Sequence, residues 1–448
     1  SGQPKGVAVE HRQVLNYVYG ISDRLSLPDG ATYATVSTLA ADLGNTAVFG
    51  ALCSGGCLHV LSGDRIADPQ TFAEYCASHR IDCLKTTPSH LAALVANEDS
   101  AQFPQCRHLI LGGEPLGWEL IPKIRHLAPD CQIWNHYGPT ETTIGVLTYK
   151  VEEELTTPTV PLGRPLPNVE TYLLDKYMQP VPLGVPGELY IGGASVAREY
   201  LHQPELTQQR FVKHPFRSEG RLYKTGDMAR YLEGGNLEFL GRNDHQVKIR
   251  GFRIELAEVE AVVAQHSQVR EVAVTTHTNK RGETELAAYI ALKDQQADTV
   301  QQLREFVRER LPGYMVPATV DTLNALPRTP SGKIDRQSLP EPTPETEETS
   351  SMAPRTQVET QLVKIWQEIL QTDNIGIQAN FFDLGGHSLL ATQVMSRVRN
   401  AFGVDIPLRS LFESPTIADL AVLVEQALVE QVDETELLQW LAEIEADS

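Results

Sequence analysis

The stretch GRNDHQVKIRGFRIELAEVE, Gly241–Glu260, separates two kinds of sequence pattern. Before it, residues 1–243 alternate short aliphatic runs, such as Leu109–Leu111, with helical stretches, such as Pro69–Ser78. This alternation is typical of a layered α/β architecture. After the break, residues 244–339 follow the order strand, helix, strand, strand, helix. The sequence therefore predicts a large α/β unit followed by a small, compact α+β unit.

A linker and a helical unit are expected beyond the small unit. Residues 340–354 read PEPTPETEETSSMAP, with four prolines, four glutamates and no aromatic residue, which is typical of a solvated linker. Residues 355–430 then predict helices, the first of which carries an apolar stripe at helical spacing: Val358, Leu362, Ile365, Trp366 and Ile369. Residues 431–448 hold six acidic residues and no basic one. We expect this acidic tail either to fray or to dock on a partner as a short amphipathic helix.

The charge balance excludes two classes of partner. The 448 residues include 38 basic and 58 acidic side chains, which give a formal net charge of −20. Nonspecific binding to nucleic acids or anionic membranes depends on a positive field, so neither is an expected partner. No apolar run is long enough to span a membrane, and the N-terminus lacks the basic and apolar regions of a signal peptide. We therefore expect a cytoplasmic protein.

The cysteines do not form the pattern of a disulfide framework. All six lie between Cys53 and Cys131. Cys53 and Cys57 have no second Cys or His pair at zinc spacing, so we expect reduced, buried thiols.

The segment NHYGPTETT, Asn135–Thr143, combines the residue types that a nucleotide site needs. Tyr137 offers a ring to stack on a base, Thr140 offers a donor for phosphate, and Glu141 offers a carboxylate for Mg²⁺. A tight Gly-Pro turn holds these groups together.

Three other segments carry residues suited to the same chemistry. SGQPKGV, at residues 1–7, places Lys5 in a small loop whose backbone N–H groups can wrap phosphate oxygens. YKTGDMAR places Asp227 in a turn, where a carboxylate can bind both ribose hydroxyls. PRTPSGKIDR places Lys333 in a glycine-containing loop.

Together with GELYIGG (Gly187–Gly193) and LPGYMVP (Leu311–Pro317), these segments resemble the adenylation domain of non-ribosomal peptide synthetases, a branch of the adenylate-forming superfamily. The resemblance spans residues 1–340. It implies an enzyme that activates an amino acid with ATP and Mg²⁺, forming an aminoacyl-adenylate and pyrophosphate. The acyl group then passes to the phosphopantetheine thiol of a carrier domain.

The segment FFDLGGHSLLATQV, Phe381–Val394, resembles a peptidyl carrier (thiolation) domain with a four-helix fold. The resemblance implies that 4′-phosphopantetheine is attached to Ser388. The preceding glycine pair lets a modifying enzyme approach the backbone, and the helix N-terminus favours the phosphate diester. The implied partners are a phosphopantetheinyl transferase and neighbouring condensation or other synthetase modules.

The resemblance also assigns roles to single residues. Lys333 would bridge the substrate carboxylate and the α-phosphate, Thr140 would contact phosphate, and Glu141 would bind Mg²⁺. The other ATP contacts would be Lys5, Gly113, Glu114, Tyr137, Asp227, Phe239 and Arg242. Asp244 stands at the family's hinge, about which the small unit swings between two poses. Lys333 serves the adenylation pose, and the VKIRG strand faces the site in the thiolation pose.

Alignment of AADLGNTAVFGAL with the family puts Asp42 where the α-ammonium binds. The pocket positions are then Asp42, Leu43, Thr46, Lys85, Ile110, Gly112, His136, Ile144, Gly145 and Lys333, a string that resembles those of aspartate-activating domains. Lys85 and His136 would face the ligand side chain. Because a buried lysine without an anion is costly, the pocket favours a carboxylate. Asparagine is the alternative, since its amide oxygen also accepts a hydrogen bond from Lys85.

Two other functions stay open at this stage. An acyl-CoA synthetase-like ligase shares the nucleotide motifs, but the fused carrier and Asp42 argue against it. A catalytically inert scaffold for the carrier is the other alternative, because the family has a substantial N-terminal part before the phosphate loop that these residues do not include. We expect that part either in a longer protein or on a separate chain.

Overall fold

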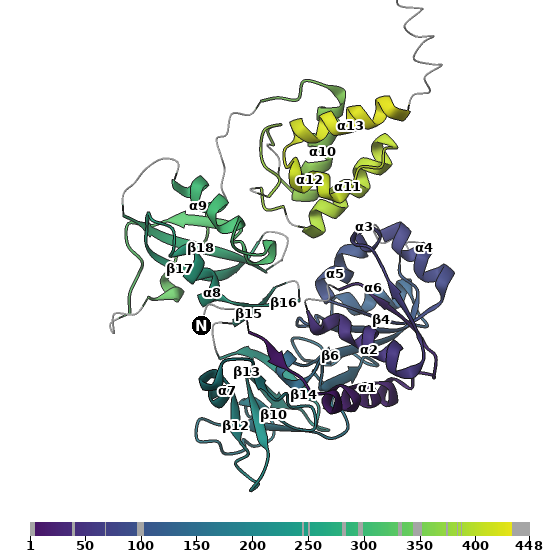
Figure 1. Cartoon of the computed structure of the whole chain (residues 1–448), viewed down its shortest axis with the longest axis vertical. Coiled ribbons are helices and arrows are strands. Elements are labelled where there is room, and N and C mark those ends of the chain that lie inside the picture. Colours follow the sequence, from purple (N-terminus) through teal and green to yellow (C-terminus); the bar gives the residue numbers. More distant parts are fainter. Residues whose placement is uncertain are drawn as a thin grey trace, which may run out of the picture.

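A computed structural model of the chain describes residues 5–37, 41–67, 69–95, 103–243, 246–249, 251–279, 284–293, 299–329, 334–343, 352–372, 375–382, 384–386 and 388–431. These residues form a large α/β unit, a small mixed unit and a helical unit (Figure 1). The multidomain α/β fold expected from the sequence is confirmed. No helix in the described ranges is long and apolar enough to cross a bilayer.

The large unit is built on a seven-stranded sheet with the order β3-β2-β4-β5-β6-β7-β8. Its strands are β2 (Thr32–Thr35), β3 (Cys57–Val60), β4 (Ile81–Thr86), β5 (Cys106–Gly112), β6 (Gln132–Tyr137), β7 (Leu147–Lys150) and β8 (Arg164–Pro165). Strands β3, β2, β4, β5 and β6 pair in parallel, whereas β7 and β8 are antiparallel to their neighbours. The carboxyl ends of the parallel strands therefore meet at one edge, which is where open α/β sheets bind ligands.

Helices cover both faces of this sheet, because a parallel sheet buries apolar side chains on both sides. They are α1 (His11–Leu25), α2 (Asn45–Ser54), α3 (Gly63–Ala67), α4 (Pro69–His79), α5 (Pro88–Leu94) and α6 (Leu120–Leu127). Helices α1 and α2 share a core with Ile110 of β5. Helices α4, α5 and α6 share another core with Leu109 and Leu111. Successive residues of β5 thus face opposite layers.

A second, antiparallel sheet completes the large unit. It has the order β12-β13-β10-β9, with β14 paired to β13. These strands are β9 (Val169–Leu174), β10 (Gly187–Gly193), β12 (Phe211–Lys213), β13 (Arg221–Tyr231) and β14 (Leu237–Arg242). A short ribbon joins β1 (Val7–Ala8) to β11 (Glu199–Tyr200), and α7 (Pro204–Arg210) follows it.

The small unit follows the predicted order of strand, helix, strand, strand, helix, with two strands that the sequence did not indicate. Its elements are β15 (Gln246–Ile249), β16 (Phe252–Glu255), α8 (Leu256–Val263), β17 (Val269–Thr278), β18 (Thr284–Leu292), α9 (Thr299–Arg308), the 3₁₀ turns η4 (Gly313–Met315) and η5 (Arg336–Ser338), and β19 (Thr319–Thr322). The unexpected strands are β16, which forms a hairpin with β15, and β19, which pairs with β18 in parallel.

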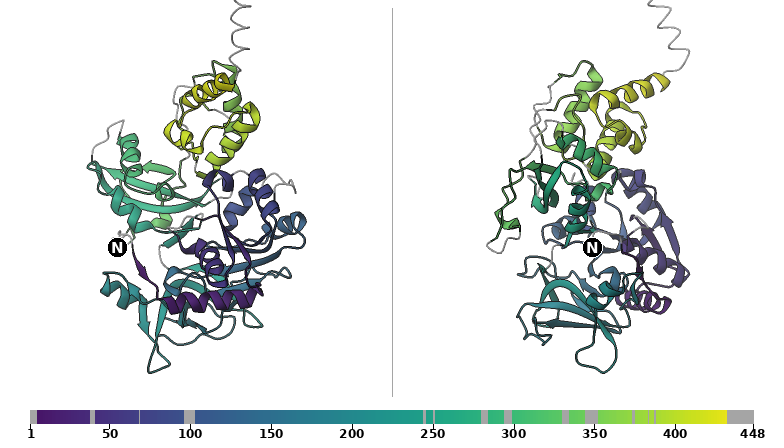
Figure 2. Two further views of the ribbon diagram at one scale, coloured as in Figure 1. Left: turned by 45° about the vertical axis from the view of Figure 1, so that its right-hand side comes forward. Right: turned by 60° about the vertical axis from the view of Figure 1, so that its left-hand side comes forward.

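The helical unit has a core of its own, drawn from residues 362–424. Within residues 352–431 it contains α10 (Gln357–Leu370), α11 (Ser388–Phe402), α12 (Leu408–Glu413) and α13 (Ile417–Gln431). The apolar stripe predicted for α10 is confirmed, because Leu362 and Trp366 are fully buried. Thr356 and Glu359 form a capping box that starts the helix. In Figure 2 this unit sits above α3, which α11 contacts.

The prediction of buried thiols at Cys53 and Cys57 is wrong, because both residues are exposed. Cys53 lies in the last turn of α2, and Cys57 begins β3, which is the edge strand of its sheet. An edge strand has a neighbour on one side only, so less of it is covered. All six cysteines are free, in agreement with the absence of a disulfide framework.

We expect Leu362→Ala to destabilise the helical unit by about 2–5 kcal/mol, because it leaves a cavity where a fully buried leucine packs. The matched control is Val422→Ala, since Val422 is 51% exposed on α13 and its truncation leaves no cavity. Calorimetric unfolding of the whole chain measures both. Equal stabilities of the two variants would contradict the assignment of this core.

Candidate functional site

Three parallel strands end side by side at the carboxyl edge of the seven-stranded sheet. Lys85 of β4 is in register with Ile110 of β5, and Gly112 of β5 is in register with His136 of β6. Side chains alternate along a strand, so Lys85, Ile110 and His136 point to the same face. This is the face that α1 and α2 cover.

Four buried polar side chains gather on this face, and we call them the polar cluster: Tyr17, Thr46, Lys85 and His136. Lys85 Nζ donates a hydrogen bond to Thr46 Oγ1 at 2.7 Å. The Tyr17 hydroxyl lies 2.6 Å from the same oxygen and 3.2 Å from His136 Nε2. Tyr17 was not predicted, because a tyrosine in an amphipathic helix is indistinguishable by pattern from an ordinary core residue.

Burial changes the protonation equilibria of two members of the cluster. It lowers the pKa of Lys85 to about 8, although the nearby Asp42 carboxylate opposes the shift. Burial, together with the charge of Lys85, lowers the pKa of His136 well below its usual value. The imidazole is therefore neutral near pH 7, while most Lys85 side chains are charged.

Asp42 opens the 3₁₀ turn η1 (Asp42–Gly44) that leads into α2. Its Oδ2 atom is buried and has no hydrogen-bond partner within the described ranges. Burial raises the pKa of this carboxyl group, and Thr140 and Lys85 oppose the rise. A buried carboxylate oxygen without a donor is costly, and a cationic ligand group would satisfy it. The predicted role of Asp42 as the ammonium-binding residue therefore fits its surroundings.

Two glycines leave room for His136. A methyl group on Gly145 would lie 1.8 Å from His136 Cε1, and one on Gly112 would lie 2.6 Å from the His136 carbonyl oxygen. Gly112 accepts no side chain unless the β6 backbone moves, and Gly145 accepts none unless the His136 ring moves. The neighbouring Ile144 has a φ of +66°, which is rare for a β-branched residue, and it packs in the same core as Ile110.

The residues predicted to bind the base and ribose lie together between the two sheets. The hydroxyl group of Tyr137, at the end of β6, donates to one carboxylate oxygen of Asp227. Arg242 donates to the other oxygen, because β13 and β14 place Asp227 and Arg242 directly opposite each other. Phe239 precedes Arg242 on β14 and packs against the main core. Burial and the Asp227 charge raise the pKa of Tyr137, so its hydroxyl stays a donor.

Glu141 lies in the 3₁₀ turn η3 (Thr140–Thr142) after β6 and is 4% exposed, next to the exposed Thr140. Arg253 of β16 donates from Nη1 to Glu141 Oε2 at 2.8 Å, and the Tyr200 hydroxyl donates to Oε1. Burial alone would raise the pKa of Glu141, but Arg253 holds it below its usual value. Arg253 is 112 residues away in sequence, so no local pattern indicated this pair.

The β15–β16 hairpin brings the small unit to the site. The ammonium group of Lys248, in the VKIRG strand, lies 5.1 Å from the centre of the Tyr137 ring. Gly251 approaches the backbone of Gly113, where an added methyl group would lie 3.4 Å from the Gly251 Cα. In the expected two-pose scheme, this arrangement corresponds to the thiolation pose.

Two further residues predicted to bind ATP, Lys5 and Glu114, have protein partners in this arrangement. Lys5 forms an ion pair with Glu255 of the hairpin. Glu114 accepts hydrogen bonds from the backbone N–H of Ser89 (3.0 Å) and from its hydroxyl group (2.8 Å), at the start of α5. Gly113 has a φ of +85°, which glycine adopts easily.

Three predicted positions cannot be placed. Asp244, Lys333 and the side chain of Ser388 lie outside the described residues, as does most of the acidic tail. Their roles stay predictions.

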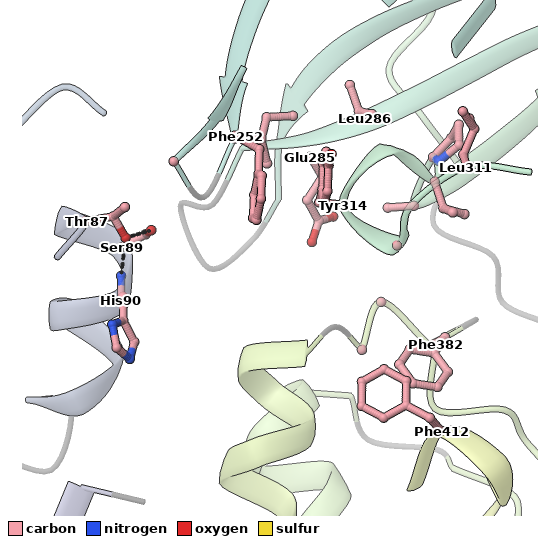
Figure 3. A pocket seen from close by; sticks show the side chains of 18 of the residues that line it. Thr87, Ser89, His90, Phe252, Glu285, Leu286, Leu311, Tyr314, Phe382 and Phe412 are labelled. Carbon is pink, nitrogen blue, oxygen red and sulfur yellow. Dashed lines mark hydrogen bonds between the residues drawn. The ribbon is translucent and has the colours of Figure 1, made fainter. Parts of the chain in front are cut away.

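A cavity of about 740 Å³ lies where the three units meet (Figure 3). The large unit contributes Leu43 and Thr86, which follow Asp42 and Lys85 in sequence. From the small unit come Phe252 and Tyr314, whose rings stack with centres 3.9 Å apart. The helical unit adds Phe382, Phe412, Gly385 and Gly386. The cavity is therefore lined both by residues that shortly precede Ser388 in sequence and by the sequence neighbours of the predicted substrate residues.

Comparison with known proteins finds relatives for each unit. Residues 1–201 match the AMP-binding enzyme family, residues 258–333 match the AMP-binding enzyme C-terminal domain, and residues 360–424 match the phosphopantetheine attachment site family. Tyrocidine synthase 3 of Brevibacillus parabrevis is 40% identical over 97% of this chain, and surfactin synthase subunit 2 of Bacillus subtilis (strain 168) is 38% identical over 95%. The chain spans 7% and 12% of the lengths of these two relatives.

Solved structures align with the chain across all three of its units. Holo-PA1221, a non-ribosomal peptide synthetase protein with adenylation and carrier domains bound to a vinylsulfonamide inhibitor, aligns with a TM-score of 0.76 and 26% identity, over 96% of this chain and 72% of that one. The four-domain synthetase holo-AB3403, bound to AMP and glycine, aligns with a TM-score of 0.51 and 33% identity, over 94% of this chain and 31% of that one.

The fold and the site thus define an adenylate-forming protein with a fused carrier unit. Within that class, the chain belongs to the non-ribosomal peptide synthetase family, as an adenylation region followed by a peptidyl carrier domain.

The lowered pKa of Lys85 predicts a pH-dependent stability. The unfolded chain has the ordinary lysine pKa, so between about pH 8 and 10.5 it binds more protons than the folded chain, and stability rises with pH. We expect Lys85→Met to remove the cost of burying the charged ammonium group. It should therefore stabilise the large unit by up to about 3 kcal/mol at pH 7, but not at pH 10.5.

Denaturant titrations at the two pH values measure this effect. The control is Lys213→Met, at an exposed position of β12. A gain that is absent at pH 7, or equal at both pH values, would contradict the assigned burial cost.

Proposed function

We propose that the chain activates L-aspartate with ATP and Mg²⁺ as aspartyl-AMP, releasing pyrophosphate, and loads it as a thioester on phosphopantetheine attached to Ser388. The observation that carries the substrate assignment is the presence of two buried, oppositely charged groups that keep unused hydrogen-bonding capacity within the described residues. Asp42 offers an oxygen without a donor, and Lys85 offers an ammonium group whose one hydrogen-bond partner among the described residues is Thr46.

An amino acid with a short acidic side chain complements both groups. Its α-ammonium satisfies Asp42, and its side-chain carboxylate neutralises Lys85, so that neither charge stays buried alone. The buried side chains of Ile110 and Ile144 limit the length of the ligand. Asparagine satisfies Lys85 through its amide oxygen but leaves its charge unbalanced, which is why we favour aspartate.

The nucleotide is proposed to bind where Tyr137, Asp227, Phe239 and Arg242 meet. Asp227 would exchange its hydrogen bonds from Tyr137 and Arg242 for the ribose hydroxyls, leaving the Tyr137 ring free to stack on adenine beside Phe239. Lys5, Gly113, Glu114 and Thr140 would surround the phosphates. Lys333 would bridge the carboxylate and the α-phosphate, and rotation at Asp244 would bring it in.

Glu141 is suited to holding Mg²⁺ with the phosphates of ATP. Magnesium typically takes one or two carboxylates plus substrate phosphates, and no group of three acidic, histidine or cysteine side chains in the described ranges is arranged to hold a metal alone. Bound there, the ion would neutralise phosphate charge. Arg253 now donates to the same carboxylate, so the ion and Arg253 would occupy Glu141 in turn, the ion during adenylation and Arg253 during loading.

The cavity between the units is proposed as the path of the phosphopantetheine arm. It begins at Gly385 and Gly386, close to Ser388, and ends beside Leu43 and Thr86. Its aromatic and aliphatic walls suit an arm that carries few charges. A phosphopantetheinyl transferase would install the arm, and neighbouring synthetase modules would receive the loaded amino acid.

We expect ATP–pyrophosphate exchange to peak with L-aspartate among the common amino acids. Because Lys85 supplies the charge for the side chain, Lys85→Met is expected to lower kcat/KM for aspartate by about 100-fold and to change that for L-alanine by less than about threefold. The control is Lys213→Met, whose lysine lies on the far strand β12. The protein should be expressed with any residues that precede Ser1 in its gene.

Each alternative gives a different result. A peak with L-asparagine would replace the proposed substrate, and equal losses with aspartate and alanine would contradict the role of Lys85. Acyl transfer to free coenzyme A but not to Ser388 would favour an acyl-CoA synthetase. No exchange with any amino acid, together with modification of Ser388, would favour an inert carrier scaffold.

A further inference from the structure

Tyr17 joins the two sides of the polar cluster. Its side chain is 0% exposed and projects from α1 between Thr46 of α2 and His136 of β6. The rings of Tyr17 and His136 meet edge to face, with centres 5.9 Å apart and an angle of 79°. Thr46 Oγ1 contacts both the Tyr17 hydroxyl and Lys85 Nζ, so it links the two side chains.

The donors and acceptors of the cluster can be assigned by counting hydrogens. Lys85 is a donor only, so Thr46 Oγ1 accepts from it. If Tyr17 donates to His136 Nε2, Thr46 donates to Tyr17, and every hydroxyl hydrogen of the cluster has an acceptor. If Tyr17 instead donates to Thr46, the Thr46 hydrogen has no acceptor within the cluster, which is costly in a buried site. The first arrangement is therefore favoured.

We propose that Tyr17 is a positioning residue for the ligand side chain, which holds Thr46 against Lys85 and keeps His136 in the tautomer with its hydrogen on Nδ1. The proposal rests on the aspartate-activating function proposed above. Without the hydroxyl, Thr46 is free to occupy another staggered rotamer, and His136 loses the bond that selects its tautomer. With it, the groups that face the ligand are oriented before the ligand binds.

The test is Tyr17→Phe, which removes one oxygen and keeps the ring in the core. Loss of the two hydrogen bonds is expected to raise KM for L-aspartate by about tenfold, while kcat stays within about twofold and KM for L-alanine is unchanged. The matched control is Tyr33→Phe, because Tyr33 is 1% exposed in the same core and its hydroxyl has no hydrogen-bond partner among the described residues. This control should behave as the wild type in exchange kinetics.

Nitrogen-15 NMR of labelled histidine tests the tautomer without any ligand. The His136 signal is assigned by its loss in His136→Gln. We expect the wild type to show hydrogen on Nδ1 and Tyr17→Phe to show a mixture of tautomers. A hydrogen on Nε2 in the wild type would overturn the proposal.

The kinetic outcomes separate this proposal from the proposed function. Aspartate selection by the wild type with an unchanged KM in Tyr17→Phe would overturn the role of Tyr17 alone. A fall in kcat that is equal for aspartate and alanine would show a merely structural role. A wild type that activates only another amino acid would overturn the proposed substrate and, with it, the positioning role.

Discussion

The hydrogen bond between Lys85 and Thr46 is the constraint on which the site depends. It keeps an ammonium group at the carboxyl edge of a parallel sheet, under a layer of two helices, where charge is costly. Burial already lowers the pKa of Lys85 to about 8, so the charged form of this side chain is only modestly favoured near pH 7. The carboxylate that we propose as the ligand side chain would neutralise the positive charge of Lys85. The substrate preference then follows from electrostatics rather than from shape alone.

A second constraint joins the large and small units. The buried Glu141 carboxylate needs a positive partner, and in this arrangement Arg253 supplies it from the β15–β16 hairpin. Lys248 against Tyr137 and Lys5 against Glu255 add further contacts between the hairpin and the large unit. If Mg²⁺ is the partner of Glu141 in the other pose, then the exchange of one cation for another links the position of the small unit to the step being carried out.

Much of this organisation was predictable because it is encoded locally. The alternation of aliphatic runs and helical stretches predicted the layered large unit, and the stripe on α10 predicted the first helix of the carrier unit. The resemblance to the family predicted that Lys85, His136, Tyr137 and Asp227 belong to one site. The residues that were not predicted depend on contacts between segments far apart in sequence. The sequence alone does not distinguish Tyr17 from an ordinary core aromatic residue, because its hydrogen bond to His136 of β6 forms only in the folded protein. In the same way, no local pattern indicates that Arg253 of the hairpin pairs with Glu141. Cys57 was misjudged because an edge strand has the same composition as a covered one.

A crystal structure of the protein with a non-hydrolysable aspartyl-adenylate analogue tests the central claim most directly. We expect the side-chain carboxylate to lie within hydrogen-bond distance of Lys85 Nζ, with the α-ammonium on Asp42 Oδ2. A bound analogue whose carboxylate points away from Lys85, with Lys85 paired to Asp42 instead, would contradict it.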